Sequence, residues 1–385
     1  MLRTWLVRPQ HALVSIPSAR QSLPTITNHN DGARRPYSDG SRPPFSYHMA
    51  ASSSAKRAKL RPAEHGSTFW TQKNVERDAP IFVSKEDYSG QDAFFMAHVA
   101  KSRRHVVFGV ADGVGGWEES GVNPAVFAHG LCRYMAELTL RPEKEEDLRP
   151  LNLMTKGHDM VQEDKNIMAG GSTASLATAD PSGYMEVANL GDSGFVVLSP
   201  GKVTFKSDPQ TSNFNTPYQL SKLTPHMKAQ FAIFGGGAPI QDHPRRSDTT
   251  HHELNHGDVV IFGTDGLWDN LSAMEVLRIV SVLMEKSGYW KSGGTSVSSV
   301  DADKVRTLLH SRDKAGDEDI ASRLAYAIMK EAKVASHDMK RDGPFAREVQ
   351  RYFPGEDYHG GKVDDIAIIA CIAVQDAAGA IKAKL

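Results

Sequence analysis

The stretch from Val107 to Trp117, VFGVADGVGGW, decides how the rest of the chain is interpreted. An aliphatic run that ends in glycines is typical of a buried strand, and Asp112 stands at the end of this one. Glycine has no Cβ, so the backbone at Gly113 can approach an ion or a phosphate closely. The pattern therefore indicates a hard metal ion at the end of a strand, which other acids would have to share.

Two further strands are predicted to meet acids at their ends. Asp265 follows the apolar run 259–263, and Asp364 precedes the apolar run 366–374. Because the end of one antiparallel strand lies beside the start of its neighbour, we expect these acids and Asp112 to converge on one edge of a sheet. Converging carboxylates repel unless cations bind, and oxygen ligands favour Mg²⁺ or Mn²⁺ over zinc. Each acid alone could be an ordinary turn residue, but the repeated acid-and-glycine pattern favours a site.

Hydrophobic periodicity predicts a chain of mixed helices and strands. Asn123 and Pro124 form a typical helix start, and Ser272 is a second N-cap candidate. Short strands joined by tight turns in the centre argue for antiparallel pairing. Gly288 to Val300, rich in Ser and Gly, is expected to be an exposed loop. The expected strands are 92–99, 105–111, 172–178, 184–190, 195–198, 259–263 and 366–374, and the expected helices are 123–138, 151–166, 272–283 and 320–334.

Charge is distributed unevenly along the 385 residues. Residues 1–62 contain ten Lys and Arg against two Asp, a net charge of +8, so the remainder carries −9. This split suggests a basic arm on an acidic domain, and we expect no nucleic-acid partner. Cys132 and Cys371 lie in apolar surroundings, which supports neither a disulfide framework nor a cysteine zinc site.

The first 40 residues have the composition of a mitochondrial transit peptide. They are rich in Arg and Ser, lack acids before Asp31, and contain no apolar stretch long enough for a membrane span. A disordered tail is the alternative interpretation. We expect residues 41–62 to form a basic linker, with nuclear targeting through 56–59 as a second interpretation. Residues 63–378 are the expected folded domain and 379–385 a C-terminal tail.

Five motifs stand in the order found in a known family, and as a set they are far more specific than any one of them. They are DGVGG (112–116), GSTA (171–174), LGDS (190–193), TDGLWD (264–269) and DDI (364–366). The chain thereby resembles the metal-dependent Ser/Thr protein phosphatases of the 2C type, the PPM family, over about residues 82–374. Four longer segments are similar to the mitochondrial branch of that family: NLGDSGF (189–195), FNTP (214–217), GPFA (343–346) and GGKVDD (360–365).

The resemblance implies an α+β fold, a four-layer sandwich of two central antiparallel β-sheets flanked by α-helices. It implies a monomer in the mitochondrial matrix that hydrolyses phosphoserine and phosphothreonine in proteins with a water activated by two Mg²⁺ or Mn²⁺ ions. Carried over by position, Asp112 bridges the two metals and Gly113 offers its carbonyl. The remaining implied ligands are Asp265 and Asp364 for the other metal, Asp92 through water, and Asp192 and Asp269 for a third, weaker metal.

The chain departs from the family pattern at the proposed site. Val114 stands where many relatives place a histidine that protonates the leaving oxygen, and Gln91 replaces an acid. No arginine occurs near Asp87, where several relatives bind phosphate, and Lys85 is our candidate substitute. These departures keep a second hypothesis open, a catalytically weak module that binds phosphoproteins.

The segment His252 to His256, HELNH, matches the H-E-x-x-H pattern of zinc proteases. That pattern requires a helix, so that both histidines share one face. Here Thr249 and Thr250 favour a strand, and Gly257 favours a turn after it. We therefore interpret the segment as structural.

Overall fold

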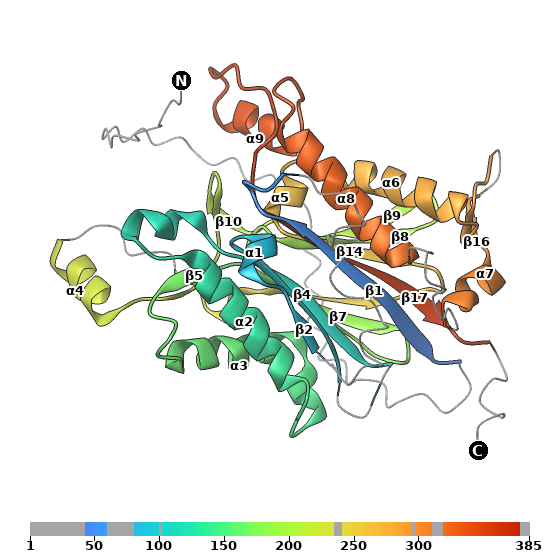
Figure 1. Cartoon of the computed structure of the whole chain (residues 1–385), viewed down its shortest axis with the longest axis horizontal. Coiled ribbons are helices and arrows are strands. Elements are labelled where there is room, and N and C mark those ends of the chain that lie inside the picture. Colours follow the sequence, from blue (N-terminus) through green and yellow to red (C-terminus); the bar gives the residue numbers. More distant parts are fainter. Residues whose placement is uncertain are drawn as a thin grey trace, which may run out of the picture. The chain divides into compact units, whose positions relative to one another are not determined.

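The computed structural model describes residues 43–59, 81–99, 102, 104–234, 241–294, 297–309 and 319–377 (Figure 1). The predicted transit peptide (1–40) and C-terminal tail (379–385) lie outside these residues. The strands are β1 (Phe45–Ser54), β2 (Ile81–Val83), β3 (Asp92–His98), β4 (Val106–Asp112), β5 (Gly170–Ser172), β6 (Ala174–Ala179), β7 (Tyr184–Leu190), β8 (Gly194–Ser199), β9 (Lys202–Lys206), β10 (Thr211–Asn213), β11 (Thr216–Pro217), β12 (Leu220–Lys222), β13 (Asp248–Glu253), β14 (Val259–Gly263), β15 (Trp290–Lys291), β16 (Ser299–Val300) and β17 (Ile366–Gln375). The α-helices are α1 (Glu86–Ser89), α2 (Pro124–Leu138), α3 (Pro150–Glu163), α4 (Pro225–Phe234), α5 (Asp265–Trp268), α6 (Ala273–Lys286), α7 (Ala302–Arg306), α8 (Ile320–Ser336) and α9 (Pro344–Tyr352).

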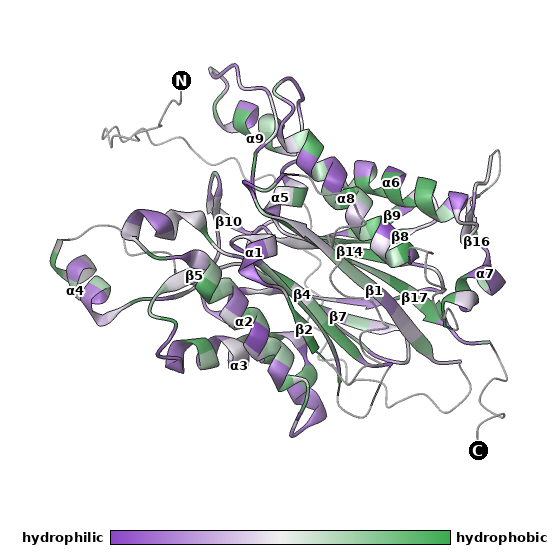
Figure 2. Ribbon diagram, in the orientation of Figure 1, coloured by the Kyte–Doolittle hydropathy of each residue, from purple (hydrophilic) through white to green (hydrophobic). Residues whose placement is uncertain are grey.

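Two antiparallel sheets hold the core. Their strand orders are β1-β17-β14-β8-β9 and β13-β7-β6-β4-β3-β2. One apolar cluster lies between the two sheets, a second between the five-stranded sheet and helices α6 and α8, and a third between the six-stranded sheet and helices α2 and α3 (Figures 1 and 2). The predicted α+β class with antiparallel sheets is confirmed, and this layering agrees with the predicted sandwich.

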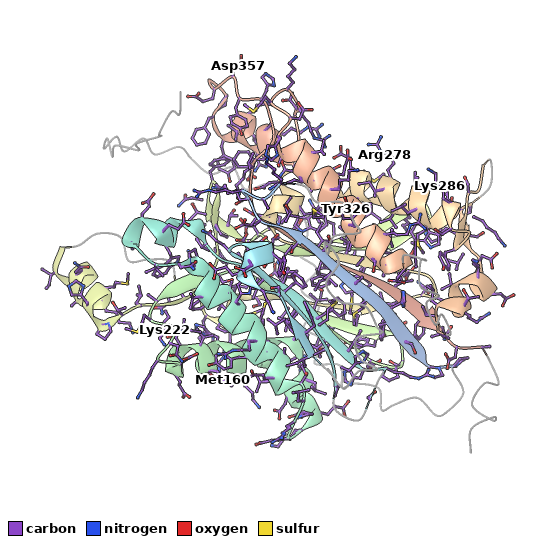
Figure 3. All side chains as sticks on the ribbon, viewed as in Figure 1. Met160, Lys222, Arg278, Lys286, Tyr326 and Asp357 are labelled. Carbon is purple, nitrogen blue, oxygen red and sulfur yellow. The ribbon has the colours of Figure 1, made fainter. Side chains whose placement is uncertain are left out.

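Strand β17 shows why the sequence pattern fits this layering. Ile368 and Ile372 pack towards α8, whereas Ile369 and Cys371 pack between the sheets. A strand buried on both faces has no polar alternation, which explains its continuous apolar run. The outward face of α6 carries the exposed side chains of Arg278 and Lys286 (Figure 3), together with those of Met274 and Val282.

The helix starts follow their predicted caps. Asn123 Oδ1 accepts a hydrogen bond from the Ala125 N–H at 3.0 Å, and Ser272 forms a capping box with Glu275 at the start of α6. None of the helices in the described ranges is both long and apolar enough to cross a bilayer.

The prediction of a linker over residues 41–62 is wrong for Phe45–Ser54, which form β1. This strand pairs with β17 over ten residues, from Phe45 opposite Gln375 to Ser54 opposite Ile366, and it is buried throughout. Its Ala and Ser side chains allow the close packing of α8, but they lack the β-branched signature that marks a strand in the sequence. The folded domain therefore begins before residue 63.

The predicted exposed loop at 288–300 is also partly wrong. Trp290 and Lys291 pair with Ser299 and Val300 in a small antiparallel ladder. The Trp290 indole is buried and donates a hydrogen bond to the Gly257 carbonyl at 2.9 Å. A single buried aromatic thus anchors a segment whose Ser and Gly content suggested only a loop.

The HELNH segment ends the predicted strand and then enters the predicted turn, because β13 stops at Glu253 and a turn follows at 256–257. His252 lies in β13, where its ring stands 4.5 Å from Phe205 and 5.4 Å from Phe195 between centroids. The strand conformation removes the helical face that the zinc-protease interpretation requires, so that interpretation is excluded.

Substituting His252 with Phe is expected to reduce the acid sensitivity of the fold. Burial, followed by the charge of His251, lowers the pKa of His252 to about 4. The unfolded chain binds this proton near pH 6.5, so between about pH 6.5 and 4 the unfolded state holds more protons and native stability falls as the pH falls. Thermal melts across that range should show a shallower decline for His252→Phe. The same substitution at the exposed His226 should leave the wild-type slope unchanged, and an equally steep decline in both variants would contradict the assignment.

Candidate active site

The predicted acids come together where the ends of the two sheets meet. Asp92 stands directly opposite Asp112 in the β3–β4 pair of the six-stranded sheet. Asp265 follows β14, and Asp364 precedes β17, in the five-stranded sheet. The Thr264 hydroxyl joins the sheets by donating a 2.6 Å hydrogen bond to Asp92 Oδ2. The expectation of a single sheet edge is therefore wrong, because the acids come from two stacked sheets.

The end of β4 is fixed by backbone contacts. The Asp112 N–H donates to Thr173 Oγ1 at 3.1 Å, and the Thr173 N–H donates to the Asp112 carbonyl at 2.9 Å. The next N–H, of Gly113, donates to the Gln91 carbonyl at 3.2 Å. A Cβ at Gly113 would lie 2.7 Å from that carbonyl oxygen, so only glycine allows this close approach.

Burial and mutual repulsion make these carboxylates unfavourable to ionise unless a cation lies nearby. Burial raises the pKa of Asp112 well above its usual range, and the charges of Asp265 and Asp92 raise it further. The pKa of Asp92 is raised by burial and by Asp365, and that of Asp192 by burial and by Asp265. Ionisation of each of these carboxyls therefore costs free energy unless a positive charge lies nearby.

Lys362 supplies part of that charge, and the residue-by-residue prediction missed it. Its Nζ lies 2.5 Å from Asp265 Oδ2, 2.7 Å from Asp269 Oδ2 and 3.4 Å from Asp364 Oδ2. Burial opposes ionisation of Asp265, but the neighbouring ammonium outweighs it and lowers the pKa of that carboxyl. Burial raises the pKa of Asp269 to about 7 despite the same ammonium. The signal in the sequence was the GGKVDD segment, whose lysine had no assigned role.

The donor set suits a hard divalent ion. All the side-chain atoms here that could coordinate a metal are carboxylate oxygens. The buried Asp192 Oδ1 has no hydrogen-bond partner among the described residues. In the described part of the chain, no three His, Cys, Asp or Glu side chains form a complete ligand set around one point. Mg²⁺ keeps several waters in its coordination shell, so protein side chains need to supply only some of its ligands. The acids therefore fit the ions that the family resemblance implies.

At three predicted positions, no side chain pairs with these acids within the described residues. Lys85 caps α1 with an exposed side chain, and no hydrogen bond or ion pair joins it to these acids within the described residues. The Gln91 amide donates to Glu118 at 2.6 Å. Val114 contributes its N–H to the Gly171 carbonyl, and its side chain has no proton to donate.

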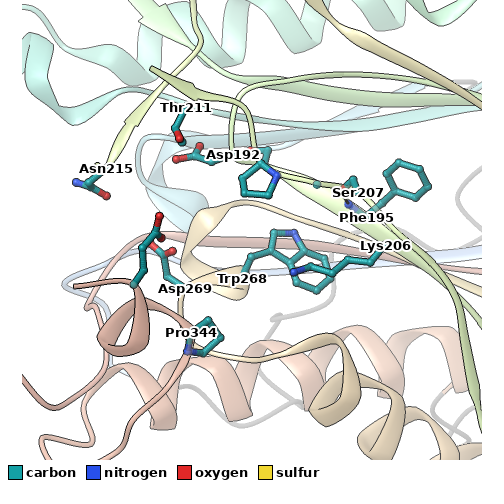
Figure 4. A pocket seen from close by; sticks show the side chains of 13 residues that line it. Asp192, Phe195, Lys206, Ser207, Thr211, Asn215, Trp268, Asp269 and Pro344 are labelled. Carbon is teal, nitrogen blue, oxygen red and sulfur yellow. Dashed lines mark hydrogen bonds between the residues drawn. The ribbon is translucent and has the colours of Figure 1, made fainter. Parts of the chain in front are cut away.

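A pocket of about 150 Å³ adjoins the cluster (Figure 4). Asp192 and Asp269 form part of its wall, and Trp268, Lys206 and Pro344 also line it. Figure 4 shows Asp192 and Asp269 reaching this space from the turn after β7 and from the end of α5. The acids assigned by resemblance to a third metal are thus the ones that border an open cavity.

With this geometry in hand, comparison with known proteins shows the family. Residues 84–307 match the family model described as protein phosphatase 2C. The chain belongs to the protein phosphatase 2C family. The match begins just before α1 and ends at the first residue of the 3₁₀ turn at 307–309. It includes Asp92, Asp112, Asp192, Asp265 and Asp269.

Relatives within the protein phosphatase 2C family extend the similarity to most of the chain. The human protein phosphatase PTC7 homolog is 30% identical over 74% of this chain and 80% of its own length. The mitochondrial protein phosphatase 2C homolog 7 of Saccharomyces cerevisiae is 28% identical over 91% of this chain and 89% of its own length. The solved structure of the photosystem II phosphatase PBCP has a TM-score of 0.55 at 23% identity and covers 87% of this chain and 99% of that one, which supports the fold.

Proposed function

We propose that this chain is a Mg²⁺- or Mn²⁺-dependent phosphatase that hydrolyses phosphoserine and phosphothreonine in mitochondrial proteins. Family membership supports phosphatase chemistry, and the composition of residues 1–40 together with the name of the yeast relative supports a mitochondrial location. The observation that carries the proposal is the buried acid cluster at the shared end of the two sheets. A phosphoprotein-binding module without catalysis would have no need for so many costly buried carboxylates.

The residues divide into metal ligands and groups that orient them. Asp112 and the Gly113 carbonyl would hold one ion, Asp112, Asp265 and Asp364 the other, and Asp92 would act through water. Asp192 and Asp269 would hold a third ion beside the pocket. When bound, such ions supply an activated water and neutralise the phosphoryl oxygens.

The protein's own residues hold the metal-binding carboxylates in a fixed orientation. Thr264 fixes Asp92 by its 2.6 Å hydrogen bond, and Thr173 fixes the Asp112 backbone and meets the Ser193 hydroxyl at 2.7 Å. These partners are buried, so the carboxylates are held before substrate arrives. Val114 donates no proton, so no side chain at that position protonates the leaving alkoxide.

Phosphate release from a phosphothreonine peptide tests the proposal. The purified protein should be inactive in EDTA and should regain activity on addition of Mn²⁺ or Mg²⁺, because the acids cannot neutralise the phosphoryl group themselves. A phosphotyrosine peptide of the same sequence serves as the specificity control and should react much more slowly. Activity that persists in EDTA would refute the metal mechanism, and binding without turnover under every metal would favour the binding module.

A further inference from the structure

A short arm leaves the body of the protein after β12. It comprises residues 223–234, most of which form α4, and Figure 1 shows α4 standing apart from both sheets. No other helix or strand of the described ranges packs extensively against α4, and none of its described side chains belongs to the three apolar clusters of the core. None of those side chains is buried, and Ile233 is 74% exposed.

The composition of α4 is that of a helix with an apolar partner. Six of its ten residues are Met, Ala, Phe or Ile. Met227, Phe231 and Phe234 follow one another at i, i+4 and i+7, a spacing that puts them on one face of a helix. A globular protein normally buries such a stripe against its own core. Because no core element packs extensively on α4, we expect the stripe to find its partner outside the fold.

The charge of this region differs from that of the rest of the folded domain. No Asp or Glu occurs between Asp208 and Asp242, whereas the chain after residue 62 carries a net charge of −9. Lys228 lies on α4 and Arg245 follows the arm, and both side chains are exposed. An apolar stripe with cations beside it and no acids is typical of a helix that lies in the interface of an anionic bilayer. A protein partner of mixed charge would not require that acids be excluded.

The root of the arm is fixed beside the candidate active site. β12 pairs with β5, and Ser172 of β5 forms a bridge to Gly113. The Trp117 indole donates a 2.9 Å hydrogen bond to Oε1 of Gln219, the residue before β12. The Lys222 ammonium donates to two carbonyls at the C-terminal end of α3, at 2.8 and 2.9 Å. The arm therefore starts from a fixed base, close to the strand end that carries the candidate metal ligands.

We propose that α4 is an interfacial helix that binds the surface of an anionic lipid bilayer. Its apolar stripe enters the boundary between headgroups and acyl chains, and Lys228 and Arg245 face the lipid phosphates. Binding holds the candidate active site near the membrane, where phosphoproteins attached to that membrane can reach it. The association is reversible, because a helix of ten residues buries too little apolar surface for permanent insertion.

Co-sedimentation of the full-length protein with vesicles tests the proposal without turnover, so its result is independent of the proposed catalysis. The wild type should bind phosphatidylcholine vesicles that contain about 20 mol% cardiolipin, and pure phosphatidylcholine vesicles at least about tenfold more weakly. Phe231→Ser combined with Phe234→Ser should weaken binding to the anionic vesicles at least about tenfold. The matched control, Val297→Ser combined with Met339→Ser, removes side chains that are 88% and 74% exposed elsewhere and should bind like the wild type.

A charge variant and thermal melts complete the test. Lys228→Glu should weaken binding at least about tenfold, whereas Lys286→Glu, at an exposed position of α6, should stay within about twofold of wild type. The Tm of the arm variants should match the wild type, because no core element packs extensively on α4. Residues 1–40 are present in every variant, so their basic charge does not produce these differences.

Two results would overturn the proposal. The first is absence of wild-type binding to the anionic vesicles, or equal binding by the wild type and the arm variants. The second is a wild-type dimer that the arm substitutions dissociate without any vesicle binding, which would replace the bilayer with a second copy of the chain as the partner of α4.

Discussion

Asp112→Asn is expected to reduce turnover of a phosphothreonine peptide at least about a thousandfold and, at the same time, to stabilise the metal-free protein. The loss corresponds to about 4 kcal/mol of transition-state stabilisation, which is within what metal-bound charge supplies. The gain arises because Asp112 is buried among Asp265 and Asp92, so an isosteric neutral side chain relieves repulsion. Near pH 8 in EDTA, about 1 kcal/mol of relief would raise the Tm by about 2 to 4 °C.

Phosphate release and thermal melts measure these two effects of Asp112→Asn separately. Asp159, an exposed acid on α3, provides the control, and Asp159→Asn should leave both activity and Tm unchanged. A fall in Tm together with the loss of activity would indicate that Asp112 is needed for folding, and the account of a strained acid cluster would be wrong.

Lys362→Met is expected to destabilise the metal-free protein strongly and the metal-loaded protein much less. The Lys362 ammonium contacts Asp265, Asp269 and Asp364, and removing one partner of a buried ion pair costs about 3 to 5 kcal/mol. Its alkyl chain is replaced by one of similar length, so the lost charge dominates. Ions bound by the same acids would supply that charge, so saturating Mn²⁺ should recover most of the loss.

Thermal melts in EDTA and in excess Mn²⁺ measure this interplay. The Tm of Lys362→Met in EDTA should fall by roughly 10 °C, and the deficit should shrink by more than half with Mn²⁺. Lys330→Met, at an exposed position of α8, should show no deficit in either buffer. An equal deficit of Lys362→Met with and without Mn²⁺ would mean that Lys362 supports packing and does not neutralise the metal-binding acids.

The sequence predicted those parts of the fold whose residues have a strong period or a cap. Strands β7 and β14 have their predicted bounds, and α2 starts at its predicted cap. β1 escaped prediction because it contains no β-branched residue, and its alternation of Phe45, Tyr47 and Met49 with polar residues gives way to a run of Ala and Ser. Its partner β17 lies more than 300 residues away, and pairing over that distance leaves no local signal.

In the candidate site, too, only the residues with a local sequence signal could be predicted. Asp112, Asp265 and Asp364 could be found because each stands at an end of an apolar strand, whereas Asp92, Asp192 and Asp269 are assigned by the family resemblance alone. The lysines that form ion pairs with these acids, Lys56 and Lys362, could not be found, because only the folded chain brings them to the carboxylates. Local sequence marks where a carboxylate leaves the core, but only the stacking of two sheets determines which lysines meet it.

The number of Mn²⁺ ions bound per chain, measured by electron paramagnetic resonance titration, tests the central claim most directly. The wild-type protein should bind two ions tightly, and both Asp112→Asn and Asp265→Asn should lose at least one of them, whatever their activity. Wild-type stoichiometry and affinity in both variants would show that these acids do not hold the metals, and the account of the site would be contradicted.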